Sequence, residues 1–158
     1  LSETNVFEEI DFVQLLSEIT ESNINRFNDV SLDIHLPGSE IIVLGWREGL
    51  TVLFRNLIEN SCVHAKLQDQ DLHIKIFVSR YDSKLEVIVS DDGTGIAQSD
   101  LPSVFKRFYR GLKSNTTGSG LGLSLAKQQT KIHGGEIELA SNVPTGTKVT
   151  VSLPILLK

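Results

Sequence analysis

The spacing of apolar residues along the chain predicts three helices. Over residues 12–27 apolar side chains recur at helical intervals, with Asp11 in the position of an N-cap. The same interval predicts a longer helix over residues 47–65 and a third over residues 125–133, which a pair of glycines would end. In the third helix, the residues spaced to pack together are Leu121, Leu125, Gln128 and Ile132.

Alternation of apolar and polar positions predicts the strands, and a tight hairpin at residues 80–83 would join two of them. Residues 1–9 are polar and are expected to be a linker remnant, so the domain would occupy residues 10–158. A stretch at about 97–117 has little core-forming content and is predicted to be irregular. The segments that alternate are residues 31–36, 41–44, 73–79, 84–90, 136–140 and 146–154.

The composition limits the class of protein. A length of 158 residues with 40% hydrophobic content fits one ordinary globular domain. The net charge of −5 argues against a basic surface that coats nucleic acid. A single cysteine, Cys62, excludes an internal disulfide and favours a reducing compartment. The chain begins at Leu1 and has no methionine, so we expect a piece of a longer protein, and no apolar run is long enough to span a membrane.

The stretch Asp91-Asp92-Gly93-Thr94-Gly95-Ile96 directly follows a predicted strand. A carboxylate delivered there could accept a hydrogen bond from the amino group of a ligand, and the glycines would let backbone approach that ligand closely. An ordinary turn is the commoner explanation for such a stretch taken alone, so the other motifs decide.

Asn56, Asn60 and His64 recur every fourth residue on the second predicted helix, so they share one face beside its apolar stripe. Asparagine is a mediocre helix former, and amides at a buried margin need partners. Solvated positions or contacts with a nearby loop remain the alternative for this row.

A glycine-rich run, Gly118-Ser119-Gly120-Leu121-Gly122-Leu123, precedes the third predicted helix. Glycines at that place leave backbone N–H groups free to face an anion. The run lacks the GK[ST] ending of a Walker A loop, and it follows a loop where a Rossmann fingerprint would follow a strand.

Together the motifs resemble, in order and spacing, the catalytic ATP-binding domain of sensor histidine kinases, over about residues 12–153. The resemblance implies the Bergerat (GHKL) fold, an α/β two-layer sandwich with a mixed, mostly antiparallel sheet of about five strands on about three helices. Nucleotide would lie between the layers, under an ATP lid at about 97–117. The matches are residues 56–60 (N box), 91–96 (G1 box), 105–110 (F box), 118–123 (G2 box) and Gly146-Thr147 (the last glycine motif).

The resemblance also implies roles for the matching positions. Asp91 would accept from the adenine amino group. Asn60 would hold Mg²⁺ through its amide oxygen, with Asn56 near the phosphates. Lys106 and Arg110 would neutralise phosphate charge from the lid, since phosphoryl transfer is catalysed mainly by positioning and charge stabilisation. The other positions expected to contact ATP are His64, Gly93, Gly95, Ile96, Tyr109, Gly118, Ser119, Gly120, Leu121, Gly122, Leu123 and Thr147.

The chain departs from the family pattern at Val63, where a lysine or arginine is common, and we expect this change to weaken nucleotide binding. Related ATPases of the fold carry a water-activating glutamate at the position of Asn56. Asparagine is not a useful general base, so we expect slow hydrolysis, with the γ-phosphate reserved for a protein acceptor. Glu59 is a weak candidate base because it lies about 100° around the helix from Asn60.

In the family the acceptor is a histidine on a separate dimerisation domain, and none of the four histidines here (His35, His64, His73 and His133) stands in that motif. The chain alone should therefore not autophosphorylate.

The resemblance implies a protein-histidine kinase that uses ATP and Mg²⁺. Its expected partners are the dimerisation and phosphoacceptor domain and a response regulator, with no nucleic acid. It implies a monomeric isolated domain, a homodimeric full protein, and a cytoplasmic location, with a membrane sensor upstream by family habit. The alternatives are a non-catalytic nucleotide-binding module, which Val63 keeps open, and a serine kinase of the anti-sigma type.

Overall fold

The computed structural model describes residues 6–27, 29–62, 71–106, 122–141 and 145–156. Its main feature is a five-stranded sheet in the order β2-β4-β5-β7-β6. The β2–β4 pair is parallel and the other three pairs are antiparallel, which confirms the mixed, mostly antiparallel sheet. The strands are β2 (Val30–His35), β4 (Leu72–Tyr81), β5 (Lys84–Asp91), β6 (Glu136–Ser141) and β7 (Thr147–Pro154).

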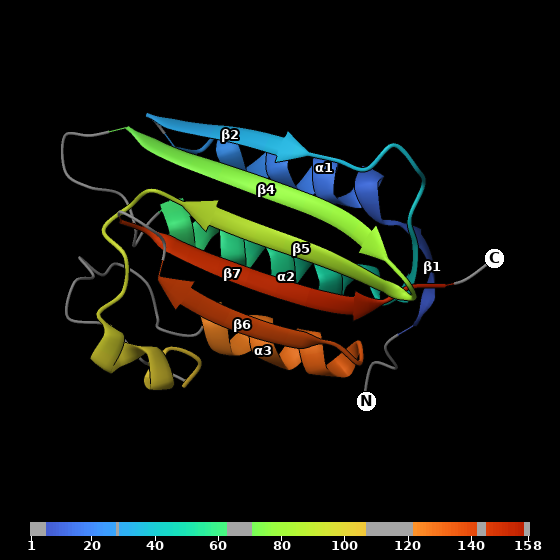
Figure 1. The fold of residues 1–158 in the computed structure, drawn as a ribbon. Coiled ribbons are helices and arrows are strands. Elements are labelled where there is room, and N and C mark those ends of the chain that lie inside the picture. The colour runs from blue at the N-terminus through green and yellow to red at the C-terminus, as the bar shows by residue number, and fades with distance from the viewer. Residues whose placement is uncertain (1–5, 28, 63–70, 107–121, 142–144, 157–158) are drawn as a thin grey trace.

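Three α-helices cover one face of this sheet: α1 (Phe12–Ile24), α2 (Arg47–Asn60) and α3 (Gly122–Ile132) (Figure 1). The core between the layers is apolar, and its largest side chains include Phe12 and Phe54, whose rings meet edge to face at 5.2 Å. The predicted cap is present, since the Asp11 carboxylate accepts from the Gln14 N–H at 3.2 Å. The two-layer α/β sandwich is therefore confirmed.

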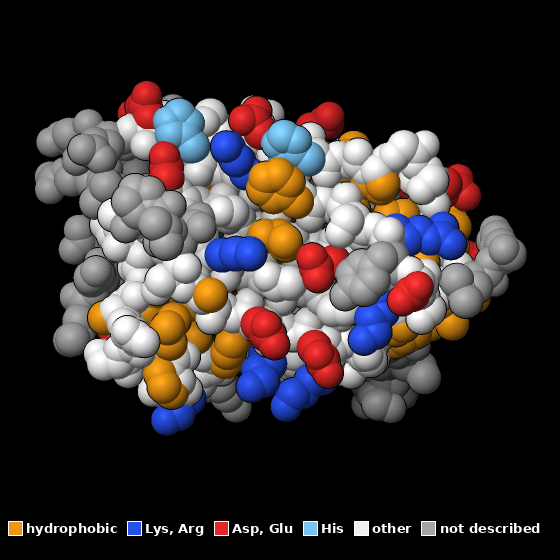
Figure 2. Space-filling view, in the orientation of Figure 1, with side chains coloured by type: hydrophobic (Ala, Val, Ile, Leu, Met, Phe, Trp, Pro, Cys, Tyr) orange, Lys and Arg blue, Asp and Glu red, His pale blue; other side chains and the backbone are white. Residues whose placement is uncertain are grey.

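The opposite face of the sheet is open (Figure 2). Acidic and basic side chains are interspersed there with small hydrophobic patches. The exposed ring of Phe77 stacks on His35, with 4.6 Å between the ring centroids. The polar groups relevant to the predicted site gather instead at one end of the sandwich.

That end brings together the last residues of α2 and β5 and the first residues of α3 and β7 (left in Figure 1). It also holds a short 3₁₀ helix, η2 (Gln98–Ser103), at the start of the segment predicted to be irregular. Residues 107–117 of that segment lie outside the described residues. None of the helices in the described ranges is long and apolar enough to cross a membrane.

The prediction that residues 1–9 are a linker is wrong for its last two residues. Glu8 and Glu9 belong to β1 (Glu8–Asp11), which pairs antiparallel with β3 (Ile42–Gly45) in a separate two-stranded sheet. The strand forms because Ile10 is fully buried in the core, whereas the residues before it are exposed. One buried side chain in a polar segment is too little to show period-two alternation in the sequence.

The packing face predicted for α3 is also wrong. Leu125 and Ile132 are 37% and 40% exposed. The inward face instead carries Ala126, Gln129 and Thr130. These smaller or polar residues lie inward because α3 approaches α2 closely, where a Cβ at Gly49 would collide with the Gln129 side chain.

The glycine stop of α3 is confirmed. Gly134 adopts a φ of +75°, and the Gly135 N–H donates back to the Thr130 carbonyl at 2.9 Å. Just before it, buried His133 accepts the Trp46 N–H at Nε2 (3.1 Å) and donates from Nδ1 to the Gln129 carbonyl (2.7 Å). The C-terminal end of α3 is thereby fixed to the start of α2.

Candidate nucleotide site

The centre of the candidate site is the Asp91 carboxylate at the end of β5, where the side chain is only 2% exposed. Its Oδ1 accepts the backbone N–H groups of Gly93 (3.0 Å) and Thr147 (3.1 Å). Its Oδ2 accepts the hydroxyls of Ser61 (2.8 Å) and Thr147 (2.6 Å). A buried carboxylate with four donors is held in one orientation, and an ionised carboxylate can only accept hydrogen bonds.

Two glycines let the turn after Asp91 pack against the start of β7. Gly95 adopts a φ of +76° and Gly146 a φ of +108°, which residues with a side chain rarely adopt. A Cβ at Gly146 would overlap the Asp91 carbonyl, and one at Gly95 would lie 3.1 Å from the Gly146 oxygen. The G1 turn and the last glycine motif, predicted separately from the sequence, therefore form one backbone unit.

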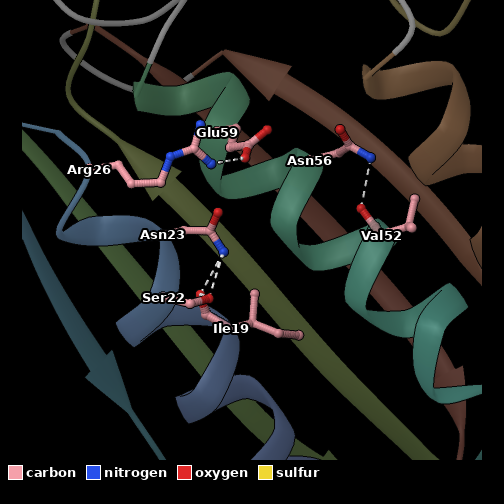
Figure 3. A network of polar contacts seen from close by, with 7 residues as sticks. All are labelled: Ile19, Ser22, Asn23, Arg26, Val52, Asn56 and Glu59. Carbon is pink, nitrogen blue, oxygen red and sulfur yellow. Dashed lines mark hydrogen bonds and ion pairs between the residues drawn. The ribbon is translucent and has the colours of Figure 1, made fainter.

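Asn56 and Asn60 lie on α2 at this same end and are both half-buried. The Asn56 amide donates to the Val52 carbonyl at 2.8 Å (Figure 3). Its Oδ1 faces the beginning of α3, since a Cβ at Gly122 would lie 3.5 Å from it. The predicted N box and the described end of the G2 run are therefore neighbours at this end of the sandwich.

The donor set fits a magnesium ion that arrives with a nucleotide. Within the described residues no group of three or more His, Cys, Asp or Glu side chains is placed to hold a metal. Asn60, at the last position of α2, offers an amide oxygen, the kind of ligand that Mg²⁺ accepts when phosphates and waters complete its shell.

The start of α3 suits an anion. Its first turn carries no acidic side chain, and its last turn carries Lys131, so the helix dipole is unopposed at the site. Leu123 is half-buried and packs against the core, which leaves its backbone as the part available to a ligand. Of the F box, Phe105 lies under the Lys127 ammonium, 5.3 Å from the ring centroid, and Lys106 is exposed.

Residues 46–157 match the model of the family described as histidine kinase-, DNA gyrase B- and HSP90-like ATPases. The chain belongs to this family. The match covers well over half of the chain and includes every motif named above, from the N box to the last glycine motif.

Relatives of this ATPase family include named kinases. The histidine protein kinase DivJ of Caulobacter vibrioides is 34% identical over 124 residues, which cover 77% of this chain and 20% of DivJ. The signal transduction histidine-protein kinase/phosphatase MprB of Mycobacterium tuberculosis is 33% identical over 154 residues, or 96% of this chain and 30% of MprB. The chain thus spans between a fifth and under a third of these relatives.

Solved structures confirm the fold of this ATPase-family chain. A mycobacterial sensor histidine kinase MprB superposes with a TM-score of 0.85 at 24% identity, over 96% of this chain and all of that one. The catalytic domain of histidine kinase ThkA gives a TM-score of 0.81 at 22% identity, over 94% of this chain and 95% of that one. At these identities the likeness shows the architecture alone.

The predicted site residues of this ATPase-family chain divide into two sets. The structure brings together at one end the members of the first set: Asn56, Asn60, Asp91, Gly93, Gly95, Ile96, Gly122, Leu123 and Thr147. The second set lies outside the described residues: His64, Tyr109, Arg110, Gly118, Ser119, Gly120 and Leu121. Lys106 belongs to neither set, since the structure describes it as an exposed residue shortly after η2.

Sequence reasoning missed Ser61. This serine directly follows Asn60, is 3% exposed, and donates to Asp91 from the C-terminal end of α2. One signal could have found it, because a small hydroxyl residue beside the apolar stripe at a helix end needs a buried partner.

Proposed function

We propose that this chain is the catalytic, ATP-binding domain of a sensor histidine kinase, which binds Mg-ATP and donates the γ-phosphate to a histidine on a separate dimerisation and phosphoacceptor domain. The observation that carries the proposal is the buried Asp91 carboxylate, oriented by four donors at the end of the sandwich where α2 meets the start of α3. Membership of the ATPase family supports it, and so do relatives named as histidine kinases.

Asp91 would select the base. A carboxylate presents only acceptors, so it favours the 6-amino group of adenine and repels the 6-oxo group of guanine or hypoxanthine. Gly95 and Gly146 let the turn after Asp91 pack closely against the start of β7, where a side chain would collide with backbone. Thr147 belongs to this pocket because it orients both oxygens of the carboxylate.

The phosphates would lie between α2 and α3. The start of α3 offers N–H groups and a positive dipole end, and Asn56 offers an amide beside it. Lys106, together with Arg110 of the F box, would add positive charge from the lid side, and Asn60 would hold Mg²⁺. When bound, the ion supplies charge neutralisation on the phosphate oxygens.

The reaction would transfer the phosphoryl group from oxygen to nitrogen. The bond between the γ-phosphorus and the bridging oxygen breaks, the phosphorus bonds to a ring nitrogen of the acceptor histidine, and ADP leaves with the oxygen. A neutral imidazole is already a nucleophile, so this chain needs to position the phosphate and needs no general base. Water, by contrast, has to be activated, and Asn56 does not do that.

Glu59 is held away from such a role. Its carboxylate forms an ion pair with Arg26, 3.0 Å between Oε1 and Nη1, on the side of α2 that faces the end of α1 (Figure 3). The acid is therefore engaged in a contact between two helices, and slow hydrolysis by the isolated domain follows.

The acceptor domain would lie in the part of the protein beyond this chain, which covers under a third of its relatives. Leu125 and Ile132 are two exposed apolar side chains, two turns apart on the outer face of α3, with exposed Gln128 between them; the first residue of α3, Gly122, borders the site. These two apolar side chains could contact one face of a helix in the acceptor domain. A homodimeric full protein, a response regulator downstream and a cytoplasmic location complete the proposal.

The test supplies the missing partner. The chain is mixed with Mg-ATP labelled at the γ-phosphate and with the phosphoacceptor domain of the same full-length protein, and the bond formed is identified by its stability. Acid-labile phosphate on the acceptor is the expected result. Acid-stable phosphate would indicate a serine kinase, and nucleotide binding without transfer would indicate a non-catalytic module.

The matched control compares two asparagines. Asn60→Ala should abolish transfer, because it removes the proposed magnesium ligand. Asn25→Ala removes an exposed amide at the end of α1 that donates to the Glu21 carbonyl at 3.1 Å, and should leave transfer unchanged.

A further inference from the structure

Ser61 connects the two functional ends of the site. It is the C-cap of α2, where its N–H donates to the carbonyls of Leu57 and Ile58, and it directly follows Asn60. Its side chain turns toward the sheet and donates to Asp91 Oδ2 at 2.8 Å, with both residues at least nine-tenths buried. A single residue thus joins the helix that carries the proposed magnesium ligand to the carboxylate that faces the base.

The four donors to Asp91 come from different layers of the molecule. Gly93 follows β5, and Thr147 begins β7, so their groups belong to neighbouring strands of the sheet. Ser61 alone among these four donors comes from the helical layer. Loss of the Ser61 hydroxyl would leave the N–H donors of Gly93 and Thr147 on Oδ1 and the Thr147 hydroxyl on Oδ2, but it would remove the described donor that comes from α2.

We propose that Ser61 is a positioning residue for base selection, which holds the Asp91 carboxylate in the orientation that presents an acceptor to the purine. The inference rests on the proposed function and adds a specificity determinant to it. With two hydroxyls on Oδ2, the carboxylate cannot turn away from a base that offers the wrong group. Without the Ser61 hydroxyl the carboxylate can shift, and the loss of affinity for a purine with a 6-oxo group becomes smaller.

The consequence is a change in discrimination between two nucleotides that differ at one position. ATP offers a 6-amino donor, and inosine triphosphate offers a 6-oxo acceptor on an otherwise matching purine, ribose and triphosphate. A site built around a buried acceptor should prefer ATP by about a hundredfold or more. Loss of Ser61 should lower that ratio about five- to tenfold, the scale of one ordinary hydrogen bond, because the hydroxyl acts on the base through the carboxylate.

The experiment measures the affinities of Mg-ATP and Mg-inosine triphosphate by calorimetry for the wild type, Ser61→Ala and Ser61→Cys. The cysteine variant keeps the volume and supplies only a weak donor, so its ratio should fall in the same direction. Ser17→Ala is the matched control, because it removes a half-buried serine hydroxyl on α1 that donates to the Val13 carbonyl at 2.9 Å. Its ratio should equal that of the wild type.

The outcomes separate the two proposals. A wild type that does not bind ATP overturns the proposed function and this inference with it. A wild type that prefers ATP, with the same ratio in a folded Ser61→Ala or Ser61→Cys variant, overturns this inference and leaves the proposed function standing. A general loss of affinity for both nucleotides at constant ratio also contradicts it, because a merely structural serine would give that result.

Discussion

Thr147 contacts both oxygens of Asp91, since its backbone N–H donates to Oδ1 at 3.1 Å and its hydroxyl donates to Oδ2 at 2.6 Å. The two oxygens thus face different kinds of donor. Among the described contacts, Oδ1 accepts from the N–H groups of Thr147 and Gly93, which cannot reverse, whereas the hydroxyls of Ser61 and Thr147 at Oδ2 can turn and accept. This asymmetry decides what an amide in place of the carboxylate would do.

Asp91→Asn should fold and should lose ATP binding. The amide oxygen would take the Oδ1 position, the NH₂ group would take the Oδ2 position, and the hydroxyls of Ser61 and Thr147 would reverse to accept from it. The group that faces the adenine amino group would then be a donor, so we expect affinity to fall about a hundredfold or more. Calorimetric titration with Mg-ATP and a thermal melt measure the two effects.

Asp92→Asn is the control for that variant. The Asp92 side chain is exposed and accepts the His73 N–H at 2.8 Å, a bond that an amide oxygen can also accept. Its ATP affinity should stay within about twofold of the wild type, since no charge-assisted contact with the base is lost. Unchanged ATP affinity in folded Asp91→Asn would overturn the assignment of base selection to this residue.

Gly146→Ala should destabilise the fold. The residue adopts a φ of +108°, and an added Cβ would overlap the Asp91 carbonyl, so both strain and collision oppose the substitution. We expect a loss of about 2–4 kcal/mol in the free energy of unfolding, measured by urea denaturation. Gly38→Ala is the matched control, because a Cβ there meets no atom within 4 Å, and it should change that free energy by less than about 1 kcal/mol. Equal losses in the two variants would contradict the role given to the Gly146 backbone.

Much of this molecule follows from local pattern. Asp11 caps α1 as predicted, Gly134 ends α3, and Asp91 follows a strand into a glycine turn. Each of these features is specified by a few neighbouring residues, whose backbone or capping needs are visible in the sequence. The convergence of distant motifs was inferred from their order, and the contacts of Asp91 with Thr147 now give it a physical form.

The features that the sequence did not predict depend on contacts between residues that lie far apart in the chain. β1 forms because β3 offers a strand edge and Ile10 has a place in the core, and neither fact is local. The rotation of α3 depends on a close approach at Gly49, which lies far away in the sequence. Ser61 was missed for the same reason, since its hydroxyl bond reaches Asp91 across 30 residues.

Glu59→Gln should leave phosphotransfer to an added acceptor domain within about threefold of the wild type, because imidazole needs no general base. The Arg26–Glu59 pair is partly exposed, with side chains 62% and 28% accessible, so its loss should cost less than about 1 kcal/mol of stability. Initial transfer rates and urea denaturation test both statements. Arg26→Gln breaks the same ion pair from the other side and should give the same transfer rate and stability as Glu59→Gln. A large loss of transfer rate in Glu59→Gln alone would identify Glu59 as a base.

Val63→Lys should tighten ATP binding. Val63 lies outside the described residues, so this prediction rests on its place three residues after Asn60, where the sequence resemblance calls for a lysine or arginine. A lysine there would add one charge-assisted contact with the triphosphate, worth about 1–3 kcal/mol, or roughly 5- to 150-fold in affinity.

Charge and length are separated by a second substitution at the same position. Val63→Gln supplies a long polar side chain without charge and should give little of the gain. The gain of Val63→Lys should also shrink as salt rises from low to high concentration, because screening weakens an exposed contact between opposite charges. Calorimetric titrations at two salt concentrations measure this dependence. Equal affinities for Val63→Lys and the wild type would contradict the prediction that Val63 weakens nucleotide binding. Equal gains for the lysine and glutamine variants would show that the gain in affinity comes from side-chain length.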